Sequence, residues 1–175
     1  MKFESESNEK TYDGKELTIT REQIHFVSGN IDEDEGYSYE IQEIKSITLA
    51  GESSSVFKVV IYKDGKDCTS HYKIDYNYGK LSVIVRDITL TAESAEKFYD
   101  GSPLTCNEII YDEFALAEGD YISSYTIRGS QTNIGISSNV IDVTSIIIKN
   151  SSGQNVTSSY QITTIDGELK VSFNK

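Results

Sequence analysis

Glu9-Lys10-Thr11-Tyr12-Asp13-Gly14-Lys15-Glu16-Leu17-Thr18 returns, with substitutions, as Glu96-Lys97-Phe98-Tyr99-Asp100-Gly101-Ser102-Pro103-Leu104-Thr105. The shift is 96 − 9 = 87 residues, about half of the 175-residue chain. Asp-Gly predicts a turn in both copies, because aspartate can bond its own backbone and glycine accepts a positive φ. The flanking tyrosine and leucine are expected to pack apolar surface. The chain is therefore interpreted as a tandem duplication before any strand is assigned.

The duplication predicts two domains of nearly equal size, residues 1–87 and 88–175, each with its own small core. No Gly, Ser or Pro linker separates them at Arg86-Asp87, so the two are expected to form a stiff, end-to-end pair. Composition agrees with a globular chain made of strands, since it includes 12 Tyr, 6 Phe, a single Pro and no Trp.

Strand-like segments recur about seven times in each copy, at the spacing typical of a β-sandwich. Expected strands cover residues 2–6, 17–20, 23–27, 37–41, 56–62 and 81–85 in the first copy, and 88–92, 121–127, 143–149 and 169–171 in the second. Ile134 and Ile136 are aligned with Ile47 and Leu49. Asp166-Gly167 predicts a β-hairpin, because Asp-Gly suits the turns that join antiparallel strands.

A second repeated landmark precedes the last two strands. Asp67-Cys68-Thr69-Ser70-His71-Tyr72-Lys73-Ile74 matches Asn155-Val156-Thr157-Ser158-Ser159-Tyr160-Gln161-Ile162. With Tyr-Asp-Gly-x-x-Leu-Thr, the segment Gly129–Gly135 with Asn139 beyond it, and the closing Gly-x-Leu-x-Val, this landmark makes the chain resemble the YDG-type repeats of bacterial cell-surface and adhesin-like proteins. The resemblance implies tandem Ig-like β-sandwich domains in an extracellular stalk or spacer, with no catalytic residues to transfer. Another small all-β module, such as a β-grasp, remains an alternative topology.

Several tyrosines are candidates for structure or for binding. By analogy with Ig-like folds, Tyr72 and Tyr160 are expected to be tyrosine corners whose hydroxyls bond upstream backbone, with a ligand contact as the alternative. A rival hypothesis places a glycan- or host-protein-binding face on a tyrosine-rich strand surface made of Tyr37, Tyr39, Tyr76 and Tyr78. One contiguous patch of exposed aromatics would favour that rival.

Charge limits the partners that the chain can have. The formal net charge of −12 disfavours nucleic acid and anionic membrane, whose phosphates would be repelled. The acidic run at residues 30–36 lacks the EF-hand spacing, so a solvated loop is preferred to a calcium site at Asp32, Asp34 and Glu35. His25 and His71 are interpreted as surface residues, and no metal or cofactor is expected.

No catalytic set is found in the sequence. Gly-x-Ser-x-Gly, His-Glu-x-x-His and phosphate-binding loops are all missing from it, which argues against an enzyme. Cys68 and Cys106 occupy non-matching places in the two copies and are interpreted as ordinary small apolar residues, with a disulfide between them as the alternative. An internal Lys-to-Asn/Asp isopeptide bond stays open.

The leading hypothesis is a non-enzymatic structural module, monomeric and extracellular, whose partners are neighbouring repeats of the same chain. No apolar run of membrane-spanning length or secretory signal occurs in the sequence. Any signal or anchor is therefore expected outside this segment.

Overall fold

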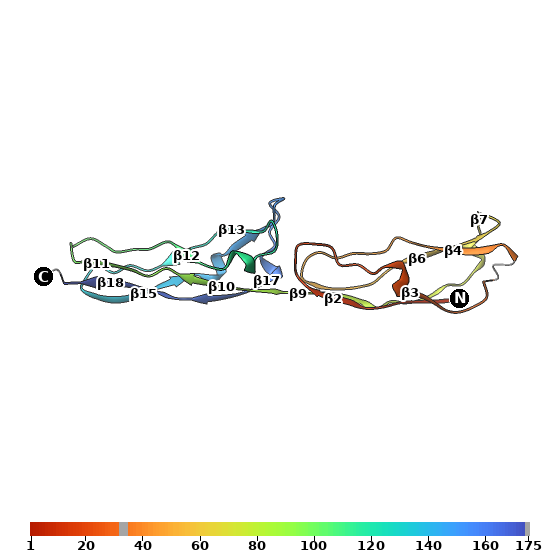
Figure 1. The fold of residues 1–175 in the computed structure, drawn as a ribbon, viewed down its shortest axis with the longest axis horizontal. Helices are drawn as coiled ribbons and strands as arrows, with labels where there is room; N and C mark the ends of the chain where they lie inside the picture. Colours follow the sequence, from red (N-terminus) through yellow and green to blue (C-terminus); the bar gives the residue numbers. More distant parts are fainter. Residues whose placement is uncertain (32–34, 174–175) are drawn as a thin grey trace. The chain divides into compact units, whose positions relative to one another are not determined.

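The computed structural model describes residues 1–31 and 35–173, and these form an all-β protein built from several small sheets (Figure 1). This confirms the predicted fold class at that level. The chain divides into two compact units, one made of residues 1–11 and 15–84, the other of residues 12–14 and 85–175. The first Tyr-Asp-Gly turn therefore belongs to the second unit, which the sequence does not predict.

In its described residues the first unit has three sheets, ordered β3-β1-β8, β2-β9-β5 and β4-β6-β7. Their strands are β1 (Lys2–Ser5), β2 (Asn8–Thr11), β3 (Ile24–Ser28), β4 (Tyr37–Gln42), β5 (Gly51–Ser54), β6 (Lys58–Lys63), β7 (Lys66–Asp67), β8 (Asp75–Asn77) and β9 (Lys80–Ile84). The connections between these strands include 3-10 turns at Arg21–Gln23 and Thr69–His71.

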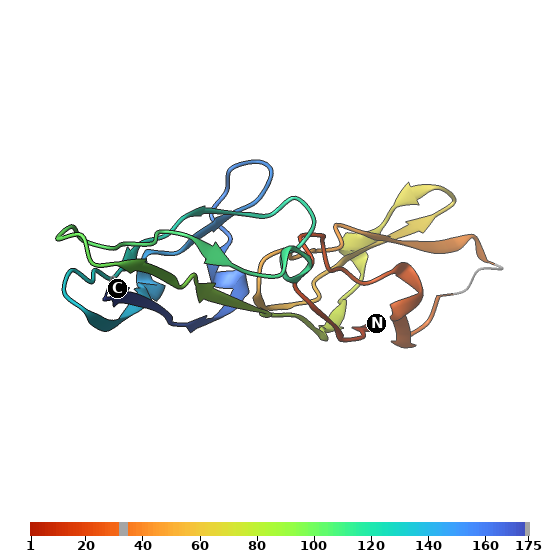
Figure 2. The same ribbon diagram turned by 60° about the vertical axis from the view of Figure 1, so that its left-hand side comes forward.

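The second unit repeats this plan with the orders β12-β10-β17, β11-β18-β15-β14 and β13-β16. In Figure 2 the strands of this unit are coloured from green to blue. Its strands are β10 (Arg86–Ala92), β11 (Ala95–Phe98), β12 (Ile109–Ile110), β13 (Tyr121–Ser124), β14 (Ile127–Arg128), β15 (Gly135–Ile141), β16 (Ile147–Lys149), β17 (Tyr160–Ile165) and β18 (Gly167–Ser172). The 3-10 turns are Glu113–Ala115, Val143–Ser145 and Thr157–Ser159.

The first and last strands of each unit run parallel to one another. In the second unit β10 pairs with β17 over six residues, Arg86 opposite Tyr160 through Thr91 opposite Ile165, and β11 pairs with β18 from Ala95 opposite Leu169. The first unit has the same arrangement, with β1 beside β8 and β2 beside β9. In each unit the first two strands and the last two strands therefore pass side by side from one sheet into another.

At this crossing a buried polar side chain ties the strands together. Asn139, which is fully buried, donates from Nδ2 to the Glu93 carbonyl oxygen at 2.9 Å and to the Cys106 carbonyl oxygen at 2.9 Å. Ser55 is its counterpart in the first unit and donates to the Glu6 carbonyl oxygen at 3.1 Å. Glu93 lies between β10 and β11, and Glu6 lies between β1 and β2. A buried side chain therefore holds the equivalent crossing in each unit.

The predicted hairpin at Asp166-Gly167 is wrong. The adjacent strands β17 and β18 pair with β10 and β11, in different sheets, and not with each other. A Cβ on Gly167 would overlap the backbone of Ala92 and Glu93, and one on Gly79 would overlap that of Glu6. The glycine is required for this close backbone approach, which a two-residue sequence pattern does not distinguish from a hairpin turn.

Other predicted strands are shorter or broken. Leu17 forms an isolated bridge to Ile47 and not a strand. Leu17 and Ile19 are nevertheless buried, so their apolar character reflects packing and not strand pairing. The expected strand at residues 143–149 begins only at Ile147, since Asp142 accepts bonds from Thr144 and closes a 3-10 turn first. The expected strand at residues 121–127 is interrupted between β13 and β14.

The predicted alignment of Ile134 with Ile47 is also displaced. Gly51 and Gly135 have matching φ values of +142° and +147° and lie opposite Val83 and Val171 on the last strands. The local shift is therefore 135 − 51 = 84 residues. Because 84 is three fewer than the shift at the first motif, the copies differ by a three-residue length change on either side of this strand.

Matched apolar residues form each core. Phe3, Ile61 and Leu81 are fully buried in the first unit, and Leu90, Ile148 and Leu169 take the same places in the second. Burying such side chains contributes about 1.5–3 kcal/mol each relative to exposure.

Candidate functional site

The two Tyr-Asp-Gly turns have the same backbone. φ is +77° at Gly14 and +78° at Gly101, the left-handed geometry expected of glycine in this position. In the second turn, the Asp100 carboxylate accepts bonds from Lys97 Nζ at 2.7 Å and from the Ser102 backbone amide at 2.9 Å. Lys97 and then Ser102 lower the pKa of Asp100 below its ordinary range.

A lysine at the start of each motif braces its turn. Lys97 Nζ also donates to the Ser102 carbonyl oxygen at 2.6 Å, and Lys10 Nζ donates to the Lys15 carbonyl oxygen at 2.7 Å. The sequence carries a signal for this role, because Glu-Lys recurs ahead of Tyr-Asp-Gly in both copies. Composition alone does not single these lysines out.

Burial separates the two turns. Tyr12 is 1% exposed, whereas its counterpart Tyr99 is 48% exposed. Within the second unit the Tyr12 ring packs edge-on against Tyr160, with ring centres 5.4 Å apart at an interplanar angle of 77°. Gly14 is close to the same site, since a Cβ built on it would lie 3.8 Å from the Ala117 Cβ. The first turn is thus a packed part of the second unit.

One carboxylate serves both buried tyrosines. Tyr12 donates its hydroxyl proton to Asp120 Oδ2 at 3.1 Å, and Tyr160 donates to the same oxygen at 2.6 Å. Burial, and next the Asp120 charge, raise the pKa of Tyr12 to about 12. Burial and the bond to Asp120 raise the pKa of Tyr160 as well. We call Tyr12, Ala117, Asp120 and Tyr160 the tyrosine socket.

The two predicted tyrosine corners differ. The Tyr160 hydroxyl accepts a bond from the Ala117 backbone amide, 43 residues upstream, at 2.9 Å. Tyr72 is half-buried and lies edge-on to Tyr37, with ring centres 6.4 Å apart. Burial and the neighbouring Tyr37 raise the pKa of Tyr72.

Tyr37 and Tyr72 line a surface cavity of about 420 Å³ in the first unit. Lys63 Nζ donates to the Tyr37 hydroxyl at 3.2 Å and lies 4.3 Å from the centre of its ring. The remaining lining residues are Asp64, Lys66, Asp67, Cys68 and His71. Aromatic faces beside cationic and hydrogen-bonding groups suit a polar, ring-shaped ligand.

The other tyrosines proposed for a binding face pack in separate ring clusters. Tyr39 lies against Phe3 and Phe26, with ring centres 5.2 Å and 6.3 Å away. Tyr76 and Tyr78 stack on each other at 5.5 Å, and both contact Phe57. Their hydroxyls are also engaged: Tyr76 accepts a bond from the Val59 amide and Tyr78 donates to the Phe57 carbonyl oxygen.

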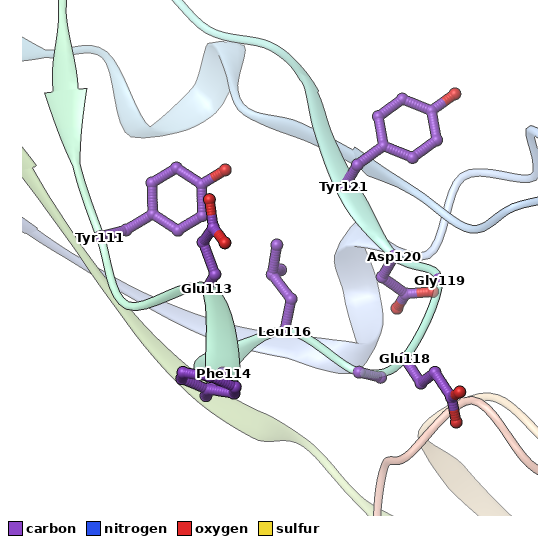
Figure 3. A pocket seen from close by; sticks show the side chains of 9 residues that line it. Tyr111, Glu113, Phe114, Leu116, Glu118, Gly119, Asp120 and Tyr121 are labelled. Atoms are coloured by element: carbon purple, nitrogen blue, oxygen red, sulfur yellow. The ribbon is translucent and has the colours of Figure 1, made fainter.

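A second cavity, of about 540 Å³, lies beside the tyrosine socket and includes Asp120 in its lining. Figure 3 shows the Leu116 side chain between the rings of Tyr111 and Tyr121 in this cavity. Arg86 fixes the adjacent loop by donating to the Ala115 carbonyl oxygen at 2.7 Å.

Asp32, Glu33 and Asp34, the centre of the acidic run, lie outside the described residues. Among residues 1–31 and 35–173, no group of three or more His, Cys, Asp or Glu side chains is placed to hold a metal ion. His25 Nε2 pairs with Glu6 Oε1 at 2.8 Å, and Cys68 and Cys106 are free thiols, not a disulfide.

Comparison of the chain with protein-family models gives no match, and comparison with curated protein sequences gives none at a significant level. Nor does the described part of the chain contain a helix with the length and apolar character needed to cross a bilayer.

Proposed function

We propose that the chain is a non-enzymatic structural spacer, a pair of Ig-like β-sandwich repeats from a bacterial cell-surface, adhesin-like protein. The observation that carries the proposal is the parallel pairing of first and last strands in both units. It gives each unit a way to resist tension along the chain, which is what a surface spacer requires.

The resistance follows from the direction of the hydrogen bonds. In the parallel pair β10–β17, pulling the start of the first strand away from the end of the last displaces the strands along their length. The ladder bonds are then strained together in shear and are not broken one at a time. The pair β11–β18 continues this arrangement beyond the crossing, where Asn139 joins the Glu93 and Cys106 carbonyls.

Single-molecule pulling of the whole chain by its two ends tests this proposal. We expect two discrete unfolding events, one for each compact unit. The force of each event depends on the rate at which that unit unfolds. Each event should release the length of about 87 residues, roughly 30 nm at 3.3–3.6 Å per residue. Asn139→Ala should lower the unfolding force of one event and leave the other unchanged. Smooth extension without discrete events would contradict the proposal.

A spacer must also hold its repeats apart in solution. A single compact globule of 175 residues has a radius of gyration near 16 Å, by about 2.2·N^0.38 Å. The spacer proposal expects a clearly larger value from small-angle scattering of a monomeric sample. A value near that of the globule would count against it.

A second candidate function is recognition of a glycan or host matrix protein, and the Tyr37–Tyr72 cavity favours it. A glycan and matrix-protein binding screen on the chain tests this function. Saturable binding that is lost in Tyr37→Ala and kept in Tyr78→Ala would support it. The matched variant is informative because Tyr78 packs on Phe57 and is not among the residues that line this cavity.

A further inference from the structure

An exposed aromatic surface lies where β11 and β18 end together in the second unit. Phe98 is opposite Ser172 in the strand pair, and the Tyr99 amide donates to the Ser172 carbonyl oxygen at 2.8 Å. The exposed fractions are 61% for Phe98, 48% for Tyr99 and 72% for Phe173. Three large aromatic side chains therefore meet solvent within a few residues of one turn, a pattern that marks interaction surfaces.

The first turn shows what such a turn contacts. Residues 12–14 have the same sequence and the same glycine φ as residues 99–101, and they are packed in the tyrosine socket. There Tyr12 meets the Tyr160 ring at 5.4 Å and the Asp120 carboxylate at 3.1 Å. A Tyr-Asp-Gly turn and a socket of this kind are thus complementary in shape and in hydrogen bonding.

We propose that the Tyr99 turn, with Phe98 and Phe173 beside it, docks a further repeat of the same kind. The occupant is an all-β repeat that has a tyrosine and an aspartate at the positions of Tyr160 and Asp120. This inference rests on the proposed spacer function and adds to it the surface that joins successive repeats. The contact uses different surfaces on its two sides, so each repeat can dock one neighbour and receive another.

The chemistry defines the partner closely. Buried tyrosine hydroxyls need acceptors, and a single carboxylate oxygen accepts both in the socket. A partner that offers an apolar groove without the carboxylate would leave the Tyr99 hydroxyl unsatisfied. The socket of the second unit already holds Tyr12, so it is not available to a Tyr99 turn from another molecule. The natural chain is accordingly expected to stay monomeric.

The test lengthens the whole chain by one repeat. Residues 1–173 are continued by a second copy of residues 86–175, because Phe173 matches Val85 at a shift of 88. Tyr99→Ala is then placed in both the natural and the lengthened chain, and thermal unfolding is followed by calorimetry. We expect little change in the natural chain and a loss of about 5–10 °C in one transition of the lengthened chain.

A conservative variant separates docking from a merely local effect. Tyr99→Phe keeps the ring and removes the hydroxyl, so in the lengthened chain it should shift the transition by less than Tyr99→Ala. Amide exchange of residues 98–101 gives an independent measure, and these amides should become more protected in the lengthened chain. Equal shifts in both chains, or no shift and no protection in the lengthened one, would overturn the inference.

Failure of this test can be told apart from failure of the spacer proposal. If the added repeat folds but does not depend on Tyr99, docking is refuted. The pulling experiment on the natural chain then still decides whether each unit resists tension by itself.

Discussion

The two Tyr-Asp-Gly turns share a sequence and a backbone but not an environment. Gly14 and Gly101 differ by 1° in φ, whereas the tyrosines before them are 1% and 48% exposed. The difference lies in the socket that receives Tyr12, which brings Tyr160 and Asp120 to one turn and not to the other. A local motif thus sets the shape of a turn, and residues more than 100 positions away set its burial.

Removing the buried ring should have the largest effect. Tyr12→Ala is expected to lower the free energy of unfolding of the second unit by about 3 kcal/mol, the usual cost of deleting a buried aromatic ring. Its matched control, Tyr99→Ala, should change the stability of the natural chain by no more than about 0.5 kcal/mol. Urea unfolding measures both, and equal losses would remove the distinction between the turns.

Removing the shared acceptor should come next. Asp120→Ala leaves the hydroxyls of Tyr12 and Tyr160 without their common partner, which is expected to cost about 2 kcal/mol. Asp120→Asn keeps one acceptor oxygen and should cost less. The comparable change in the exposed turn, Asp100→Ala, should affect only the local bonds to Lys97 and Ser102. If Asp120→Ala unfolds like the parent in urea, the carboxylate does not stabilise the socket.

The backbone should respond alike in both turns. Gly14→Ala and Gly101→Ala each place a Cβ at positive φ, so each should lose about 1 kcal/mol. At Gly101 nothing lies within 4 Å of the added atom, and at Gly14 the nearest atom is 3.8 Å away, an ordinary contact. Chemical unfolding of the two variants should therefore show similar losses, and a much larger loss at Gly14 would reveal a packing cost as well.

The response to alkaline pH should also distinguish the two turns. The pKa of Tyr12 is about 12 in the folded chain, against about 10 for an ordinary tyrosine. Above pH 10 the unfolded chain releases this proton while the folded chain retains it, so stability is full below pH 10 and falls between pH 10 and 12. Tyr12→Phe should flatten that fall in a pH series of melting curves, and Tyr99→Phe should not.

Sequence reasoning finds the elements that local chemistry determines. Strands β3, β4 and β9 lie within one or two residues of their predicted positions, because alternation and β-branched runs reflect burial on a strand. The Tyr-Asp-Gly geometry is likewise local. Leu17 is buried but does not belong to a strand, so the prediction of a strand there is wrong.

The long-range features could not be predicted in the same way. Asp120 lies 108 residues from Tyr12 in the sequence, and no local pattern connects the two residues. Gly167 follows an aspartate, and the pair predicts a hairpin, although the glycine serves a crossing between sheets. The counterpart of Asn139 in the first unit is Ser55. Both side chains donate a hydrogen bond, but the different residue types do not reveal the equivalence in the sequence.

The parallel terminal strands have a consequence for how such a chain grows. Because the first and last strands of a unit point the same way, the chain enters the unit at one end and leaves it at the other. Duplication of the coding segment therefore adds another unit without a return connection. Insertion into a loop of an unrelated domain would instead need linkers that span the unit. This topology suits growth by serial duplication, which is what the 87-residue shift between the two Tyr-Asp-Gly motifs predicts.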